Sequence, residues 1–198
     1  TTLASRLPQR TWFHYSGDYR IGTRYLGEAI LDNAKREAMK SPLLAELLRS
    51  DSIYLCNNIT INNLKPLSGF LGMVGDPALG GLGIDEFKRR QALHRDAEVC
   101  SMLDVREFID KSSEIYGYPH FINDAGGSLC ELDEPGVLEQ LAEDTLIVYL
   151  KPSDEMLEKI IERSMDEPKP MYYRSEFLDH VLPEDLEEVS LSHPNEIV

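Results

Sequence analysis

One short segment limits the possible folds of this chain more than any other. Residues 145–150, Thr-Leu-Ile-Val-Tyr-Leu, form an almost unbroken run of apolar, β-branched and aromatic side chains. The run is too short for a membrane-spanning helix and is typical of a strand buried on both faces of a parallel sheet. Such a sheet needs helices on both of its faces. The segment therefore predicts an α/β protein with a parallel sheet flanked by helices.

The rest of the chain alternates short apolar runs with long amphipathic stretches, as this fold requires. Aromatic and β-branched residues predict further strands at residues 11–15 and 120–124. Apolar side chains at helical spacing predict helices at residues 19–39, 43–48, 64–74 and 84–103, from residue 105, from residue 135, and at 156–165. Residues 51–60 fit either a short strand or an extended connection. We expect a single domain over residues 1–198, with a helical insertion at about 41–118 and an acidic tail at about 183–198.

Composition excludes several classes of protein. The chain has 198 residues, and 42% of them are hydrophobic, which is enough to build a core and argues against wholesale disorder. Its net charge of −15 repels phosphate backbones and argues against nonspecific nucleic-acid binding. No apolar stretch approaches the ~20 residues of a membrane-spanning helix. We therefore expect neither a nucleic acid nor a membrane as partner.

The cysteines point to a reducing compartment. Cys56, Cys100 and Cys130 are widely spaced and include no Cys-x-x-Cys pair. Neither a disulfide framework nor a cysteine zinc site is expected from such a pattern. The sequence thus predicts a cytoplasmic protein.

The first residues, Thr1-Thr2-Leu3-Ala4, resemble the segment that follows Gly-Lys in a phosphate-binding P-loop. In that loop, glycines turn the backbone, a lysine contacts the β- and γ-phosphates, and a Ser or Thr hydroxyl holds Mg²⁺. The helix that follows points its N-terminal amides at the phosphates. The glycines and the lysine are not in the sequence, so the resemblance implies that they lie upstream of Thr1. An ordinary helix explains the same four residues.

The segment Ser16-Gly17-Asp18-Tyr19-Arg20 follows the first predicted strand. It resembles the segment after the second strand of small-molecule P-loop kinases such as adenylylsulfate kinase. The resemblance implies that Asp18 orients or deprotonates an attacking hydroxyl and that Arg20, or equally Arg24, holds substrate anions. Phosphoryl transfer depends more on positioning and charge neutralisation than on a strong base, which suits these residue types. A turn with Asp18 as the N-cap of the next helix is the alternative interpretation.

The segment Phe121-Ile122-Asn123-Asp124 resembles a Walker B strand. In such a strand the terminal carboxylate holds Mg²⁺ directly or through water, and the resemblance implies this role for Asp124. The small residues after it, Ala125-Gly126-Gly127-Ser128, would let a phosphate or a substrate approach closely. An Asp at the end of a strand is also a common cap or turn residue.

The order of these segments resembles that of the P-loop kinase-like branch of the NTPases. The resemblance implies a three-layer fold whose central strand precedes Thr1. It also implies an ATPase or phosphotransferase that uses Mg²⁺ and ATP, with an unidentified small-molecule acceptor. Thr1 and Thr2 would bind the nucleotide, Thr1 and Asp124 would hold the metal, and Asp18 and Asp124 would be catalytic. Cations of a lid over the phosphates would come from Arg163, Lys169 and Arg174.

Basic residues gather on the predicted helix at 84–103. In an acidic protein these residues suggest an anion site, with Arg89 as a candidate substrate ligand; they are Lys88, Arg89, Arg90, His94 and Arg95. Pairing with acids one turn away, such as Glu86 with Arg90 and His94 with Glu98, is the favoured explanation of the cluster.

Two other functions are compatible with the sequence. An acidic surface and a helical insertion suit a non-catalytic α/β module that binds a basic protein partner. A doubly wound hydrolase or transferase that uses residues 124–131 is less favoured, because the chain has no Gly-x-Ser-x-Gly motif.

Overall fold

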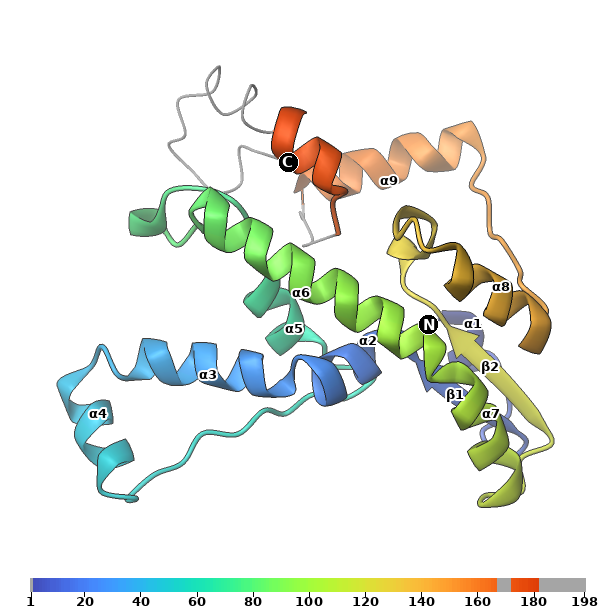
Figure 1. Cartoon of the computed structure of the whole chain (residues 1–198), viewed down its shortest axis with the longest axis horizontal. Coiled ribbons are helices and arrows are strands. Elements are labelled where there is room, and N and C mark those ends of the chain that lie inside the picture. Colours follow the sequence, from blue (N-terminus) through green and yellow to red (C-terminus); the bar gives the residue numbers. More distant parts are fainter. Residues whose placement is uncertain (1, 167–171, 182–198) are drawn as a thin grey trace. The chain divides into compact units, whose positions relative to one another are not determined.

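The computed structural model describes residues 2–166 and 172–181 (Figure 1). The chain divides into two units. The first comprises the residues up to Phe70 together with Phe108–Gly126, and the second comprises Leu71–Glu107 together with the residues from Gly127 onward. Within the described ranges, no helix is both long and apolar enough to cross a bilayer.

A pair of parallel strands forms the centre of the first unit. Strands β1 (Trp12–Ser16) and β2 (His120–Asp124) pair in register, from Trp12 opposite His120 to Ser16 opposite Asp124. Parallel strands need a long crossover, and helices supply much of the chain between these two (Figure 1). The predicted strands are confirmed, with β1 shifted by one residue. The observed class is a largely helical protein with a small parallel sheet.

Aromatic side chains pack against one face of this sheet. Phe13 of β1 stacks on Phe121 of β2, with their ring centroids 5.6 Å apart and their planes at 10°. Helix α7 (Val105–Glu114) adds Phe108, whose ring centroid lies 5.0 Å from that of Tyr15. Successive side chains of a strand point to opposite faces, so the alternate residues of β1 lie away from this aromatic face.

Short helices flank the strands in the first unit. The Ser16 hydroxyl accepts a hydrogen bond from the Tyr19 N–H at 3.3 Å and caps the first helix after β1. The predicted helix at 19–39 is interrupted by a π-helical turn, closed by the Leu26 N–H donating to the Ile21 carbonyl. The helices and turns of this part are α1 (Thr2–Arg6), α2 (Gly17–Arg20), η1 (Ile21–Tyr25), α3 (Gly27–Ala38), α4 (Pro42–Arg49) and α5 (Lys65–Leu71).

One helix boundary differs from the predicted one for a local reason, and one open prediction is resolved. Helix α5 ends before the predicted residue 74, because Gly72 adopts a positive φ of 63°, which is a left-handed helix stop. Residues 51–60 form an extended connection, with only an isolated bridge from Thr60 to Asn63.

The second unit is helical in its described part. Its long helix α6 (Ile84–Leu103) has the predicted bounds, and α8 (Pro135–Asp144) begins at the predicted proline. Val74, Phe87 and Leu178 form a buried apolar cluster beside α6. The remaining elements are η2 (Pro77–Leu79), η3 (Gly127–Glu131), α9 (Asp154–Asp166) and η4 (Phe177–Val181).

Helix α6 also buries polar side chains along one side, namely Arg90, Gln91, His94, Glu98 and Ser101. The Gln91 Oε1 accepts a hydrogen bond from the Tyr173 N–H at 3.1 Å, and the Ser101 hydroxyl donates to the Glu98 carbonyl at 2.9 Å. His94 is 6% exposed, and its Nδ1 has no hydrogen-bond partner among residues 2–166 and 172–181. Burial lowers the pKa of His94 to about 4, so its imidazole is neutral at physiological pH.

The prediction for residues 145–150 is wrong for the described structure. The segment is extended but forms no strand pairing within residues 2–166 and 172–181. Its side chains are exposed rather than buried on both faces, with Leu146 at 90% and Tyr149 at 72%. An apolar run specifies a buried strand only where another strand bonds to it, and no described segment of the chain does so.

Candidate functional site

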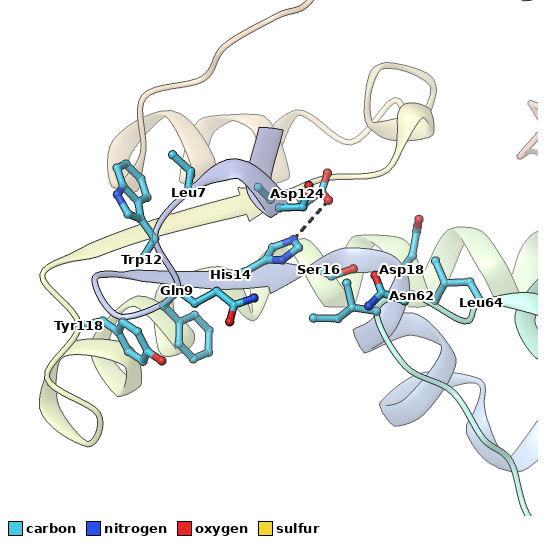
Figure 2. A pocket seen from close by; sticks show the side chains of 14 residues that line it. Leu7, Gln9, Trp12, His14, Ser16, Asp18, Asn62, Leu64, Tyr118 and Asp124 are labelled. Carbon is cyan, nitrogen blue, oxygen red and sulfur yellow. Dashed lines mark hydrogen bonds and ion pairs between the residues drawn. The ribbon is translucent and has the colours of Figure 1, made fainter. Parts of the chain in front are cut away.

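A cavity of about 690 Å³ in the first unit extends from Trp12, the first residue of β1, to Asp124, the last residue of β2 (Figure 2). This volume suits a small organic ligand. Its walls come from the end of α1, from β1, α2 and β2, and from residues 61–64. The polar lining residues are Ser5, Gln9, His14, Ser16, Asp18, Asn62, Tyr118 and Asp124.

The strand register brings the two predicted carboxylates together. Ser16 is the last residue of β1 and lies opposite Asp124, the last residue of β2. Helix α2 starts directly after Ser16 and carries Asp18 in its first turn. Carboxyl ends of parallel strands meet at one edge of a sheet, which is where ligands of α/β proteins usually bind. Asp18 and Asp124 therefore line one cavity although they are far apart in sequence.

Charge and burial affect Asp18 in the same direction. Burial raises the pKa of the Asp18 carboxyl, and the negative charge of Asp124 raises it further. A carboxyl with a raised pKa is a stronger proton acceptor when it is ionised. This position is consequently suited to accepting a proton from a ligand.

His14 is part of the site, although the sequence pattern gave no reason to select it. Its Nε2 lies 3.3 Å from Asp124 Oδ2, where a protonated ring nitrogen donates a hydrogen bond to the carboxylate (Figure 2). Both side chains are about one-fifth exposed. The alternation of β1 could have revealed this contact, since residues 14 and 16 share a face and Ser16 pairs with Asp124.

The arginines predicted to bind the acceptor lie elsewhere in the first unit. The Arg20 guanidinium carbon lies 4.9 Å from the ring centroid of Phe108 and 5.7 Å from that of Tyr25. Arg24 is exposed in the π-helical turn. Neither lines the cavity, and among the described residues no Arg or Lys does.

The basic cluster of α6 is paired with acids, as its second interpretation predicts. The Arg89 Nε donates to Glu86 Oε2 at 2.7 Å, and the Arg90 Nε donates to Glu86 Oε1 at 2.7 Å. These hydrogen bonds lower the pKa of Glu86 to about 2. Lys88 pairs with Asp179 at 2.7 Å. Arg89 thus has an ion-pair partner one helical turn away.

The predicted lid and nucleotide residues are located as follows. Arg174 pairs with Glu131 at 2.6 Å and donates to the Cys130 carbonyl at 3.3 Å. Arg163 and Thr2 belong to α9 and α1, and their side chains are not described. Thr1 and Lys169 lie outside the described residues, as does the predicted acidic tail.

The cavity fits one part of a Mg²⁺–ATP site. Two carboxylates in one cavity suit Mg²⁺, which binds few protein oxygens and keeps waters or substrate phosphates as its other ligands. No group of three or more His, Cys, Asp or Glu in the described ranges is arranged as a complete metal centre. A phosphate cradle needs backbone amides and a cation. The described lining supplies no such cation, so the residues fit the metal and the acceptor side rather than the phosphate side.

Comparison of the chain with protein-family models, with curated proteins and with solved structures found no match. The residues that bear on function are therefore those that line the cavity, together with the segments at 16–20 and 121–124.

Proposed function

We propose that the chain is part of a P-loop kinase-like protein, an ATPase or a small-molecule phosphotransferase that uses Mg²⁺ and ATP. The observation that carries the proposal is the meeting of Asp18 and Asp124 in one cavity. Asp124 is the last residue of β2 and Asp18 follows β1 by two residues, and these strands lie side by side in parallel. The two segments that resemble kinase motifs thus line one cavity. If Asp18 were only a helix cap and Asp124 only a turn residue, nothing would require the two to lie in the same cavity.

In this proposal Asp124 is a ligand of the metal and Asp18 faces the acceptor. When bound, Mg²⁺–ATP would supply the transferred phosphoryl group and neutralise its charge. Asp18 would take the proton from the acceptor hydroxyl, or from water in an ATPase, as the new oxygen–phosphorus bond forms and the bond from the γ-phosphorus to the departing ADP breaks. The raised pKa of Asp18 supports this role. His14 would hold the Asp124 carboxylate in position through its contact with Oδ2.

The finer fold is part of the same proposal. A three-layer P-loop fold needs a central strand that carries the phosphate loop, and the resemblance to the kinase motifs implies both upstream of Thr1. The exposed apolar residues 146–150 support this, because their composition is that of an inner strand. In such a protein, Thr1 and Thr2 would meet the nucleotide, and Arg163 and Arg174 would belong to the lid.

The test is an ATP titration of a longer form of the chain that includes the upstream segment. We expect Mg²⁺-dependent binding of ATP. Asp124→Asn should weaken this binding about tenfold or more, since it removes a charged ligand. Asp110→Asn is the matched control, because Asp110 is exposed on α7 in the same unit and outside the cavity.

Two results would contradict the proposal: no binding of ATP, or binding that Asp124→Asn leaves unchanged. Either result would favour the alternative, a non-catalytic module. The net charge of −15 and the exposed apolar residues 146–150 favour a protein partner in that case.

A further inference from the structure

A tight turn at residues 60–63 forms one wall of the cavity in the first unit. Its ends bond to each other, since the Thr60 N–H donates to the Asn63 carbonyl at 3.2 Å and the Asn63 N–H donates to the Thr60 carbonyl at 3.0 Å. The Asn63 Nδ2 also donates to the Asn58 carbonyl at 2.7 Å. The two residues at the tip, Ile61 and Asn62, both line the cavity. The turn therefore presents one apolar side chain and one amide to a ligand.

Contacts outside the cavity fasten the segment that carries this turn. The Asn57 Nδ2 donates at 2.7 Å to the carbonyl of Gly27, the first residue of α3. Ile59 packs closely over Gly22 of the π-helical turn, where a Cβ on the glycine would lie 3.3 Å from the Ile59 Cγ2. A loop that is fixed before its ligand arrives loses less entropy on binding. These contacts consequently suit a turn that binds a ligand.

The amide of Asn62 is used differently from those of the asparagines near it. Asn57 and Asn63 donate to backbone carbonyls, whereas the Asn62 side chain makes no hydrogen bond within the described part of the chain. Figure 2 shows Asn62 at the end of the cavity where Asp18 and Ser16 lie. An amide both donates and accepts hydrogen bonds, so it can hold a hydroxyl group or a water molecule in one orientation.

We propose that Asn62 orients the phosphoryl acceptor, by a hydrogen bond between its amide and the attacking hydroxyl or water beside Asp18. This role rests on the function proposed above. The attacking oxygen bonds to the γ-phosphorus and loses its proton to Asp18, and the bond from the γ-phosphorus to the departing ADP breaks. Side-chain amides orient the attacking water in other enzymes that hydrolyse nucleotides. Asn57 is a positioning residue in this scheme, because it acts through the turn.

Hydrolysis of ATP by the longer protein tests the proposal, with water as the attacking group and no other acceptor added. We expect Asn62→Ala to lower kcat about tenfold or more and to leave the Kd of Mg²⁺–ATP unchanged, because it removes a contact with the attacking water and none with the nucleotide. Asn58→Ala is the matched control, since Asn58 is exposed in the same segment and lies outside the cavity lining. It should change neither quantity.

Asn57→Ala tests whether the turn has to be held in place. Asn57 does not line the cavity, so its removal should lower kcat about threefold or more without changing the Kd of Mg²⁺–ATP. In the chain of residues 1–198 without nucleotide, the same change should speed hydrogen exchange of the Asn63 N–H. Either an unchanged kcat or an unchanged exchange rate would overturn this role of Asn57. Circular dichroism verifies that each variant is folded.

The results separate this proposal from the proposed function. If Mg²⁺–ATP binds in a way that depends on Asp124, then an absence of hydrolysis, or a kcat that Asn62→Ala leaves unchanged, would overturn the role of Asn62 and keep the nucleotide site. Weaker binding of Mg²⁺–ATP by Asn62→Ala with an unchanged kcat would overturn it as well. No binding of ATP by the wild type would reject the proposed function, and the role of Asn62 with it.

Discussion

At the scale of single residues, burial determines which titratable side chains suit proton transfer and which make the stability of the fold depend on pH. Asp18 and His94 are both titratable and both desolvated, yet their surroundings differ. Asp18 opens into a cavity, where a raised pKa suits proton transfer. His94 lies inside the second unit, where burial holds its imidazole neutral. Asp18 is therefore a candidate functional residue, whereas His94 makes the free energy of unfolding depend on pH.

The lowered pKa of His94 predicts a loss of stability in weak acid. The unfolded imidazole titrates near its ordinary pKa of about 6.5, and the folded one at about 4. Between these values the unfolded state binds more protons, so the free energy of unfolding falls as the pH falls. Between about pH 7 and about pH 5 the contribution is on the order of 2 kcal/mol.

Urea denaturation of the wild type and of His94→Gln at the two pH values measures this contribution. The variant should have the smaller pH dependence, because glutamine does not titrate. His180→Gln, which changes an exposed imidazole, should keep the wild-type dependence. A variant at position 94 with an unchanged pH dependence would show that this imidazole is not held neutral.

The candidate site could be predicted from the sequence only in part. Asp18 and Asp124 are predictable because each lies at the carboxyl end of a recognisable strand. The contact of His14 with Asp124 depends on the strand register, and a single strand does not reveal which neighbour it takes. The prediction that Arg20 and Arg24 bind the acceptor failed for a different reason. A motif specifies a residue type, whereas the position of a guanidinium depends on the rings and acids around it, as for Arg20 over Phe108.

At the scale of elements, local patterns predict an element well where its hydrogen-bonding partner is present in the described part of the chain. Helix α6 has the predicted bounds, and β2 begins and ends as predicted. Residues 145–150 show the opposite case. Their composition is the strongest strand pattern in the chain, yet strand formation needs a hydrogen-bonding neighbour that no described segment provides.

The exposed run predicts a stability effect that depends on the length of the protein. In the chain of residues 1–198, Val148 is 67% exposed, so Val148→Ser should change the free energy of unfolding by less than about 0.5 kcal/mol. In a longer form with the upstream strand, the same change should cost about 2 kcal/mol, because it would put a hydroxyl in a buried strand.

Val137 provides the matched control for this comparison. It is 2% exposed in α8, so Val137→Ser should destabilise both forms of the protein. Urea denaturation of Val148→Ser and of Val137→Ser, each made in both forms of the protein, measures the changes in the free energy of unfolding. An equal effect of Val148→Ser in both forms would contradict the proposed inner strand.

At the scale of the whole molecule, two features narrow the possible chemistry. The net charge of −15 disfavours anionic partners in general. The cavity has two carboxylates in its lining, one of them in contact with His14, and no Lys or Arg among the described lining residues. A bound Mg²⁺ would reverse the local charge, which is how an acidic cavity could come to lie beside a phosphate.

The central claim is that Asp124 holds the metal in the cavity of the first unit. Its most direct measurement uses Mn²⁺ with ATP on the longer protein, and follows the NMR signals of the Trp12 and His14 side chains. We predict that the paramagnetic metal broadens both signals in the wild type and in Asp110→Asn, and that Asp124→Asn removes the broadening. Unbroadened Trp12 and His14 signals with metal and nucleotide bound, or broadening that persists in Asp124→Asn, would contradict the account.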